Sequence, residues 1–213
     1  MSVGKDIHME NSFKEAWLAL DRDIRNCSKC PLRNLQQAPP VPGEGDMNSA
    51  LLIVGEALGG QEVAQGRPFV GKAGIAFREI LEEAGIPPHF AYITNTVLCR
   101  PTEIGPTGKS RNRPPDENEI KACKPWLDAR IKLMKPKFII CVGAVAARAL
   151  ISPSFSITRE RGLLTRSIYD TQAIATLHPA YLVRKSGEEY KEVRSQMVSD
   201  LIIARKACLS LLR

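Results

Sequence analysis

The chain has 213 residues, enough for one well-buried domain or two small ones, and its 44% hydrophobic and 25% charged residues are typical of an ordinary globular protein. It contains no apolar run near the roughly 20 residues that span a bilayer, and its N-terminus, MSVGKDIHMENSF, lacks the apolar segment of a secretory signal; we expect a cytoplasmic (intracellular) protein. The formal net charge of +7 favours a polyanionic partner such as nucleic acid, because each phosphate that Lys or Arg neutralises releases bound counterions.

The hydrophobic pattern of the first half of the chain alternates between helical and strand periods. A helix capped by its first serine is expected over residues 12–26, because the apolar residues recur on one face. A Pro- and Gly-rich stretch leads to a buried strand over residues 50–56. The next helix, over residues 72–85, is expected to end at its final glycine in a left-handed cap. Residues 91–96 predict a second strand.

The second half of the chain continues the alternation after a long polar loop over residues 101–115. A helix over residues 116–134 begins with Asp116 and Glu119, which are spaced as in a capping box. The remaining predicted elements are a strand over residues 137–143, a helix over 144–151, a strand over 172–178 and a C-terminal helix that begins with a second capping box of Ser186 and Glu189.

Four short apolar strands separated by helices predict a single α/β domain over residues 1–213. The expected architecture is a three-layer α/β/α sandwich with a central four-stranded parallel sheet. In such a sheet, ligands bind beyond the carboxyl ends of the strands. Three of these four ends carry polar groups suited to reading a small heterocycle, so we expect the active site there. The four ends are Gly55-Glu56, Asn95, Gly143 and His178.

The six cysteines of this long, basic chain are expected to be metal ligands or core residues rather than disulfides. Cys27 and Cys30 form a C-x-x-C pair, and Cys99 and Cys123 flank the long loop. Four thiolates from three segments are suited to a [4Fe–4S] cluster. Zinc is the alternative, although its usual pattern is two close pairs and only one is present. The two cysteines in apolar stretches are expected to be core residues: Cys141 and Cys208.

The segment GEALGGQEVAQGRPFVGKAG, residues 55–74, contains glycines that allow tight turns and a close approach of the backbone to a ligand. A dinucleotide-binding loop is disfavoured, because the G-x-G-x-x-G spacing directly after the strand is absent. Phe69 lies between a proline and a glycine in this polar segment. Such an aromatic is either a plug on the core or a stacking platform for a ligand.

Six motifs occur in an order that resembles the iron–sulfur type, family 4 uracil-DNA glycosylases: VPGEGD, VGEALGGQE, GRPFVGKAG, YITNTVLCRP, KACKPWL and HPAYL. The similarity extends from Cys27 to about Lys185. The resemblance implies a DNA-repair enzyme that acts as a monomer on uracil-containing DNA, single- or double-stranded. It also implies a monofunctional hydrolase, which releases uracil by cleaving an N-glycosidic bond and leaves an abasic site. The cluster ligands would be Cys27, Cys30, Cys99 and Cys123.

The resemblance assigns the base pocket to Phe69 and Asn95. Phe69 would stack on the uracil face, and Asn95 would read the uracil edge, accepting from N3–H and donating to O4. Cytosine presents the opposite pattern, so mismatched buried polar groups would penalise it, provided that neighbouring hydrogen bonds hold the amide in place. Without the motif, a strand-end Asn in a turn commonly binds its local backbone instead.

The resemblance assigns the chemistry to Glu56 and His178. A neutral His178 would donate to uracil O2 as the base leaves as an anion, with backbone N–H groups near Gly55 and Ala57 helping. Glu56 would orient the attacking water or oppose the positive charge that develops on the sugar. Glu62 would lie near uracil C5 and help to exclude thymine.

The segment HPAYL resembles the family's loop that supports the flipped nucleotide, with Leu182 as a wedge and with Arg184 and Lys185 holding adjacent phosphates. The alternative is a rigid turn between a strand and a helix without this role.

The sequence departs from the family pattern at four places. Leu58 replaces a usual proline, Val63 a usual acidic residue and Ala180 a usual serine, and the 23 residues between Cys99 and Cys123 form a longer loop than is typical. A loop of this kind resembles a branch that traps DNA covalently through a loop histidine. This loop has none, so trapping is not expected, but its basic residues could clamp DNA electrostatically: Lys109, Arg111 and Arg113.

Val63 keeps an alternative open, because a lost carboxylate could weaken the activation of water. The chain would then be an iron–sulfur protein that binds uracil-containing DNA with little catalysis. A further alternative is a related glycosylase that acts on another deaminated base, such as hypoxanthine or xanthine.

Overall fold

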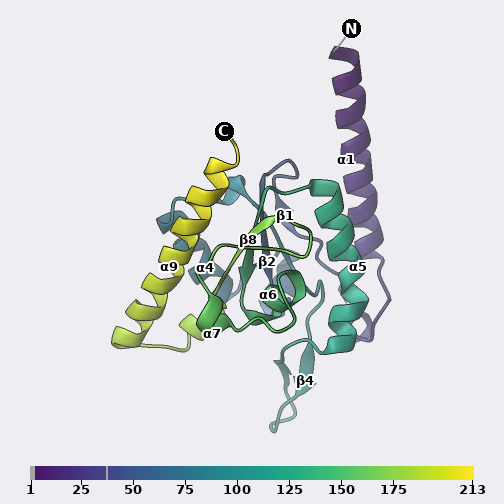
Figure 1. The fold of residues 1–213 in the computed structure, drawn as a ribbon. Coiled ribbons are helices and arrows are strands. Elements are labelled where there is room, and N and C mark those ends of the chain that lie inside the picture. Colours follow the sequence, from purple (N-terminus) through teal and green to yellow (C-terminus); the bar gives the residue numbers. More distant parts are fainter. Residues whose placement is uncertain (1–2, 37) are drawn as a thin grey trace.

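The computed structural model describes residues 3–36 and 38–213, and its centre is a sheet with four parallel strands (Figure 1). In spatial order these are β3 (Tyr92–Asn95), β2 (Leu51–Gly55), β6 (Phe138–Val142) and β8 (Gln172–Thr176). All four were expected from short apolar runs, and each boundary lies within two residues of its expected position. The predicted four-stranded parallel core is confirmed.

Two short strands extend this sheet at its edges. β1 (Glu44–Gly45) pairs antiparallel with β3, and β7 (Thr165–Arg166) pairs antiparallel with β8. Neither was predicted, because two residues are too few to show a strand period. The described sheet is therefore mixed and six-stranded, with its parallel strands at the centre.

Successive side chains of the central strands enter two different cores. Ile53 and Ile140 belong to the core formed with α4 (Lys72–Glu83) and α9 (Gly187–Ser210). Their neighbours in sequence, Leu52 and Ile139, belong to the core on the other face. That face is covered by three helices, α1 (Val3–Arg25), α5 (Glu117–Met134) and α6 (Ala144–Leu150).

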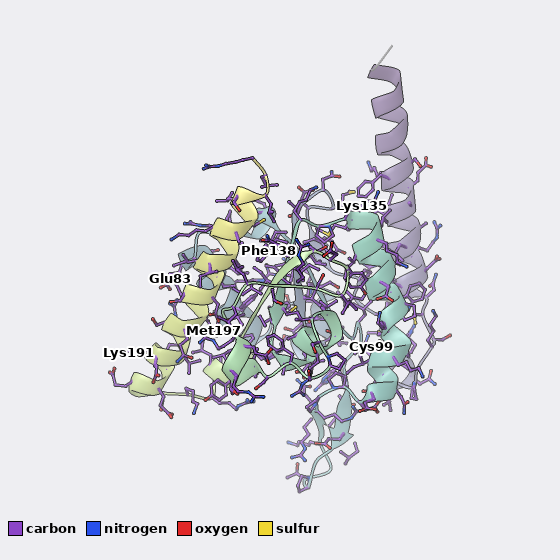
Figure 2. All side chains as sticks on the ribbon, viewed as in Figure 1. Glu83, Cys99, Lys135, Phe138, Lys191 and Met197 are labelled. Carbon is purple, nitrogen blue, oxygen red and sulfur yellow. The ribbon has the colours of Figure 1, made fainter. Side chains whose placement is uncertain are left out.

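Burial on both faces explains the continuous apolar runs of these strands and confirms the expected three layers. In Figure 2, Phe138 of β6 and Met197 of α9 mark the first of the two cores.

Two of the predicted helix ends are confirmed and two are wrong. Asp116 caps α5 in a reciprocal capping box with Glu119, and Gly85 follows α4 with a φ of +75°. The first helix begins at Val3 rather than Ser12, because the residues before Ser12 contain no proline to stop it. Ser186 precedes α9, but its side chain makes no capping hydrogen bond, and the Glu189 carboxylate pairs with Lys185 instead.

The predicted polar loop over residues 101–115 is a β-hairpin that protrudes from the body (Figure 1). Its antiparallel strands are β4 (Thr102–Ile104) and β5 (Ser110–Asn112). Five short helical segments complete the described elements: α2 (Leu32–Gln36), α3 (Gly60–Gln65), the 3₁₀ helix η1 (Pro88–Phe90), α7 (Ile157–Glu160) and α8 (Pro179–Leu182). Over the described residues, no helix is both long and apolar enough to cross a bilayer.

Candidate functional site

A cleft of about 530 Å³ lies at the carboxyl ends of the parallel strands, where the sequence predicted a site. We call it the Asn95 cleft. Its lining joins segments that follow β2, β3 and β8, and it includes the predicted residues Glu56, Ala57, Glu62, Phe69, Asn95, His178 and Arg184. Gly55 lies directly beneath it, and a Cβ at this position would stand 2.6 Å from Cζ of Phe69. The glycine therefore allows the Phe69 ring to approach the end of β2.

Phe69 is both a core residue and part of the cleft wall. Its side chain is only 7% exposed, and its ring centroid lies 5.3 Å from that of Phe77. Its backbone φ is +55°, a left-handed conformation that costs free energy in a residue with a bulky side chain. The two interpretations of Phe69, core plug and ligand platform, are therefore compatible.

The strained turn at Phe69 is held on one side by Glu62. One Glu62 carboxylate oxygen accepts from the backbone N–H groups of Val70 at 3.0 Å and Gly71 at 2.8 Å, and the other accepts from Gly59 at 3.1 Å. Glu62 thus ties the loop after β2 to the Phe69 turn. The carboxylate lines the cleft, while its discrimination at uracil C5 stays a prediction.

Arg78 of α4 holds the other side of the same turn. Its guanidinium donates to the carbonyl oxygens of Phe69 and Pro68, each at 2.9 Å, and forms an ion pair with Glu44 of β1. Burial raises the pKa of Glu44, but its bonds to Arg67 and Arg78 outweigh burial and hold that pKa below its usual range. Sequence reasoning missed Arg78 and Glu44, because an arginine on an amphipathic helix usually faces solvent.

The side-chain amide of Asn95 is available to a ligand. Asn95 ends β3, in register with Gly55 of β2, and its side chain is 3% exposed. Among the described residues, no hydrogen-bond partner takes up its amide, so the alternative of a local backbone binder is not realised. The hydrogen bonds expected to hold the amide in place are likewise absent there, and its Oδ1 lies against Gly55, where an added Cβ would collide with it. A nearly buried amide at the floor of a cleft is suited to reading the edge of a base.

His178 is held as a neutral imidazole. Its Nδ1 accepts from the backbone N–H of Ala180 at 3.2 Å, so the ring proton is on Nε2. Burial, and then the charge of Arg184, lower the pKa of His178 to about 4. Gly143, with a φ of +94°, lies against the ring, where a Cβ would stand 2.9 Å from Cβ of His178. His178 is therefore a neutral donor at physiological pH.

The lowered pKa of His178 predicts a pH-dependent stability. Between pH 6.5 and about 4 the unfolded chain protonates this imidazole and the folded chain does not. The contribution of His178 to the free energy of unfolding is therefore fully present above pH 6.5 and falls as the pH approaches 4. Urea unfolding across this range should show a smaller decline in the free energy of unfolding for His178→Asn than for the unaltered protein. Equal declines would contradict a neutral, protected imidazole.

Glu56 lies immediately after β2 and lines the cleft. Burial raises the pKa of its carboxyl group, and no charged partner among the described residues counteracts this. Raised pKa values in a cleft mark groups suited to accepting a proton near neutral pH. Val63 replaces an acidic residue that is usual in the family. It lies on α3 and is not part of the cleft lining.

The prediction that Leu182 is a wedge is wrong for this structure. Its side chain is 0% exposed, because α8 turns it into the core between the sheet, α4 and α9. The exposed side chain of this segment is the preceding one, Tyr181, at 41%. Arg184 is exposed and lines the cleft, as a phosphate contact would require, whereas Lys185 is paired with Glu189 at 3.3 Å.

The four predicted cluster ligands surround one small cavity of about 10 Å³ beside Trp126: Cys27, Cys30, Cys99 and Cys123. Two of the sulfurs already accept hydrogen bonds, Cys27 from the Trp126 indole at 3.1 Å and Cys123 from the Leu98 N–H at 3.4 Å. Over the described residues, no three His, Cys, Asp or Glu side chains converge as ligands of a single ion would. The other two cysteines are fully buried core residues, as expected: Cys141 and Cys208.

Burial raises the pKa of three of these thiols, Cys30, Cys99 to about 12 and Cys123 to about 11, and the neighbouring cysteines add to the shifts. Four thiolates placed here would need the charge of a bound metal group. Four thiols from three segments around a common cavity are the donor set of a cluster with Cys₄ ligation.

The hairpin also contributes to the lining of the same cleft. Asn112, Arg113 and Pro114, at and beyond the end of β5, are part of its lining. The base of the hairpin is fixed by Arg100, which donates to Asn112 at 2.7 Å, and by Arg113, which donates to Glu119 at 2.8 Å. The base of the hairpin therefore lies beside the cleft, while the electrostatic clamp expected of its basic residues stays a prediction.

Comparisons with known proteins agree on the family. The family model described as the Uracil DNA glycosylase superfamily matches residues 42–202. A type-4 uracil-DNA glycosylase of Pyrobaculum aerophilum is 37% identical over 169 residues, covering 76% of this chain and 82% of that protein. One from Thermotoga maritima is 36% identical, covering 80% of this chain and 84% of that protein.

The fold has a counterpart among solved structures. The crystal structure of Pedobacter heparinus SMUG2 superposes with a TM-score of 0.51 at 17% identity, covering 76% of this chain and 77% of that one. This likeness supports the α/β architecture alone. The family model and the curated relatives span most of the chain, and on that basis the chain belongs to the uracil DNA glycosylase superfamily, among the type-4 proteins.

Proposed function

We propose that the protein is a DNA-repair glycosylase that hydrolyses the N-glycosidic bond of deoxyuridine in DNA, releases uracil and leaves an abasic site. The observation that carries this proposal is the meeting of the Phe69 ring, the Asn95 amide and the neutral His178 donor in one cleft. A planar face, an edge reader and a donor for a developing anion are the groups that uracil excision requires.

Each residue has one part in the proposed reaction. Phe69 stacks on the flipped base, and Asn95 accepts from N3–H and donates to O4. His178 donates from Nε2 to O2 as uracil leaves with the electron pair of the glycosidic bond, with backbone N–H groups near Gly55 and Ala57 assisting. Glu56 accepts a proton from the attacking water and faces the positive charge on the sugar.

DNA is the proposed partner, as a single or a double strand, and the protein is proposed to act as a monomer with one domain over residues 1–213. Both cores share one sheet, which supports a single domain. Arg184 is exposed and lines the Asn95 cleft, so it is placed to contact a phosphate of the strand that enters it. Arg113 also lines this cleft but is already paired with a carboxylate. Lys109 would add to this basic surface, whereas Arg111 and Lys185 are each already paired with a carboxylate.

A [4Fe–4S] cluster is the proposed cofactor, held by Cys27, Cys30, Cys99 and Cys123. When bound, it would supply the positive charge that the four thiolates require and would join α5 to the loop after β3. The hairpin lies in sequence between Cys99 and Cys123, so two of the ligands would fix both of its ends.

The cluster proposal predicts a specific loss of iron. Cys99→Ser should lower the iron and sulfide content and the visible absorption of the anaerobically purified protein. It should also lower the melting temperature, because metal binding contributes to folding. Cys141→Ala, in the core of β6, is the matched control and should keep its full iron content. Full iron and sulfide in the Cys99 variant would rule out this ligand set, and zinc in place of iron would establish the alternative metal.

The function is tested with a labelled oligonucleotide that contains one uracil, analysed on a denaturing gel with and without alkali. Cleavage only after alkali is the expected result for a monofunctional glycosylase. An intact strand in both lanes would favour a uracil-DNA-binding protein with little catalysis, and parallel strands with hypoxanthine or xanthine would show whether another base is the substrate. A slowly migrating adduct would indicate covalent trapping.

A further inference from the structure

The segment from Leu177 to Lys185 forms a ridge between two clefts. On one side, Ala180 and Arg184 line the Asn95 cleft. On the other, Tyr181 and Lys185 line a second cleft of about 540 Å³. These two pairs share the spacing of four residues that places side chains on one side of a helical turn. The ridge therefore presents different side chains to each cleft.

The second cleft is continuous with the reaction centre. Glu56 and His178, the two residues proposed to carry the chemistry, line both clefts. The far walls of the second cleft come from the α7 segment and from the first turns of α9, where Ile157 and Val193 supply apolar surface. A strand whose glycosidic bond is cleaved between Glu56 and His178 must continue past the ridge, and this cleft lies beside its path.

The charges of the second cleft do not suit a phosphate. Its two cations are already paired, Arg161 with Asp200 at 2.7 Å and Lys185 with Glu189 at 3.3 Å. Glu192 adds a further carboxylate to the lining. Because phosphate binding relies on available cations, a neutral group fits this cleft better.

Tyr181 provides a surface for a neutral, flat ligand. Its side chain is 41% exposed, and Nζ of Lys185 lies 4.9 Å from the centre of its ring. An exposed aromatic ring in a cleft that also offers apolar surface is a stacking platform for a base of any sequence. The ring also follows His178 by only three residues, so it lies near the proposed site of cleavage.

We propose that the second cleft binds the base of a nucleotide next to the target uracil in the same strand, stacked on Tyr181. This inference rests on the proposed glycosylase function and adds a subsite to it. The subsite would hold the strand on the side of the ridge away from uracil, so that the flipped nucleotide cannot slide back while the base is cleaved.

The test uses single-stranded oligonucleotides with one uracil, in which the nucleotide on either side is replaced in turn by a tetrahydrofuran abasic analogue. Removing the neighbouring base on one of the two sides should lower kcat/KM of the unaltered protein about tenfold. Tyr181→Ala should lower kcat/KM by the same factor on the strand that keeps the neighbouring base. On the strand without that base, the substitution should cause no further loss of kcat/KM. Tyr181→Phe, which keeps the ring, should behave as the unaltered protein.

Leu209→Ala is the matched control, since Leu209 is 42% exposed at the far end of α9 and lines neither cleft. It should leave every substrate unaffected. If Tyr181→Ala lowered kcat/KM equally on strands with and without the neighbouring base, the proposed subsite would be refuted. A loss confined to duplex DNA would also overturn it and identify Tyr181 as a wedge.

Failure of the glycosylase function itself would appear as no excision from any strand. The subsite is then tested by binding alone, using fluorescence anisotropy and strands with tetrahydrofuran at the target position. Affinity that depends on both Tyr181 and the neighbouring base would support the subsite. Affinity independent of either one would refute it.

Discussion

His178→Ala is expected to lower kcat for uracil excision by about 10²–10³-fold, the usual cost of removing one donor to a developing anion. His178 is held for this task, because its Nδ1 accepts from Ala180 and leaves the proton on Nε2. Its pKa of about 4 further implies that kcat should not vary with the titration of this residue above pH 5. The measurement is single-turnover excision from a labelled uracil oligonucleotide across this pH range.

The matched control for this prediction is His89→Ala. His89 is exposed in the short helix η1, outside both clefts, so its removal should leave the rate unchanged. A His178→Ala variant with a rate within a fewfold of the unaltered protein would show that another group stabilises the leaving uracil.

Asn95→Ala is expected to lower kcat/KM by about 10²-fold or more, because an edge reader contributes through hydrogen bonds that no water replaces in a nearly closed site. The variant should also lose its discrimination between uracil and cytosine. The measurement is kcat/KM for single-stranded DNA with either base. Asn48→Ala, an exposed amide before β2, serves as the control.

Unchanged excision by Asn95→Ala would refute the assignment of the base reader, even if the glycosylase function itself were established. A loss of rate without any change in base preference would instead place Asn95 in the positioning of the sugar.

The sheet could be predicted from sequence because its four central strands are buried on both faces and are therefore continuously apolar. The edge strands could not, since Glu44–Gly45 and Thr165–Arg166 are too short to show a period. The hairpin was not predicted for a different reason. Its strands are exposed apart from partly covered Thr102, and Ile104 is their single apolar residue, so no apolar alternation marks them.

The cleft was predictable in part because parallel strands bring their carboxyl ends to one edge. Glu56, Asn95 and His178 meet there for this reason. The burial of Leu182 was not predictable, because the four-residue helix α8 determines which of two adjacent side chains enters the core. Arg78 was missed for a related reason, since its partners Pro68 and Phe69 lie in a turn whose shape the sequence does not reveal.

The contacts that fix the Phe69 turn have a consequence for protein engineering. The turn depends on Glu62 from α3, Arg78 from α4 and Glu44 from an edge strand, which are brought together only in the folded protein. A graft of residues 66–74 onto another α/β scaffold would transfer the aromatic ring but not the contacts that keep it in a left-handed backbone. Transplanting the pocket would require these three partners as well.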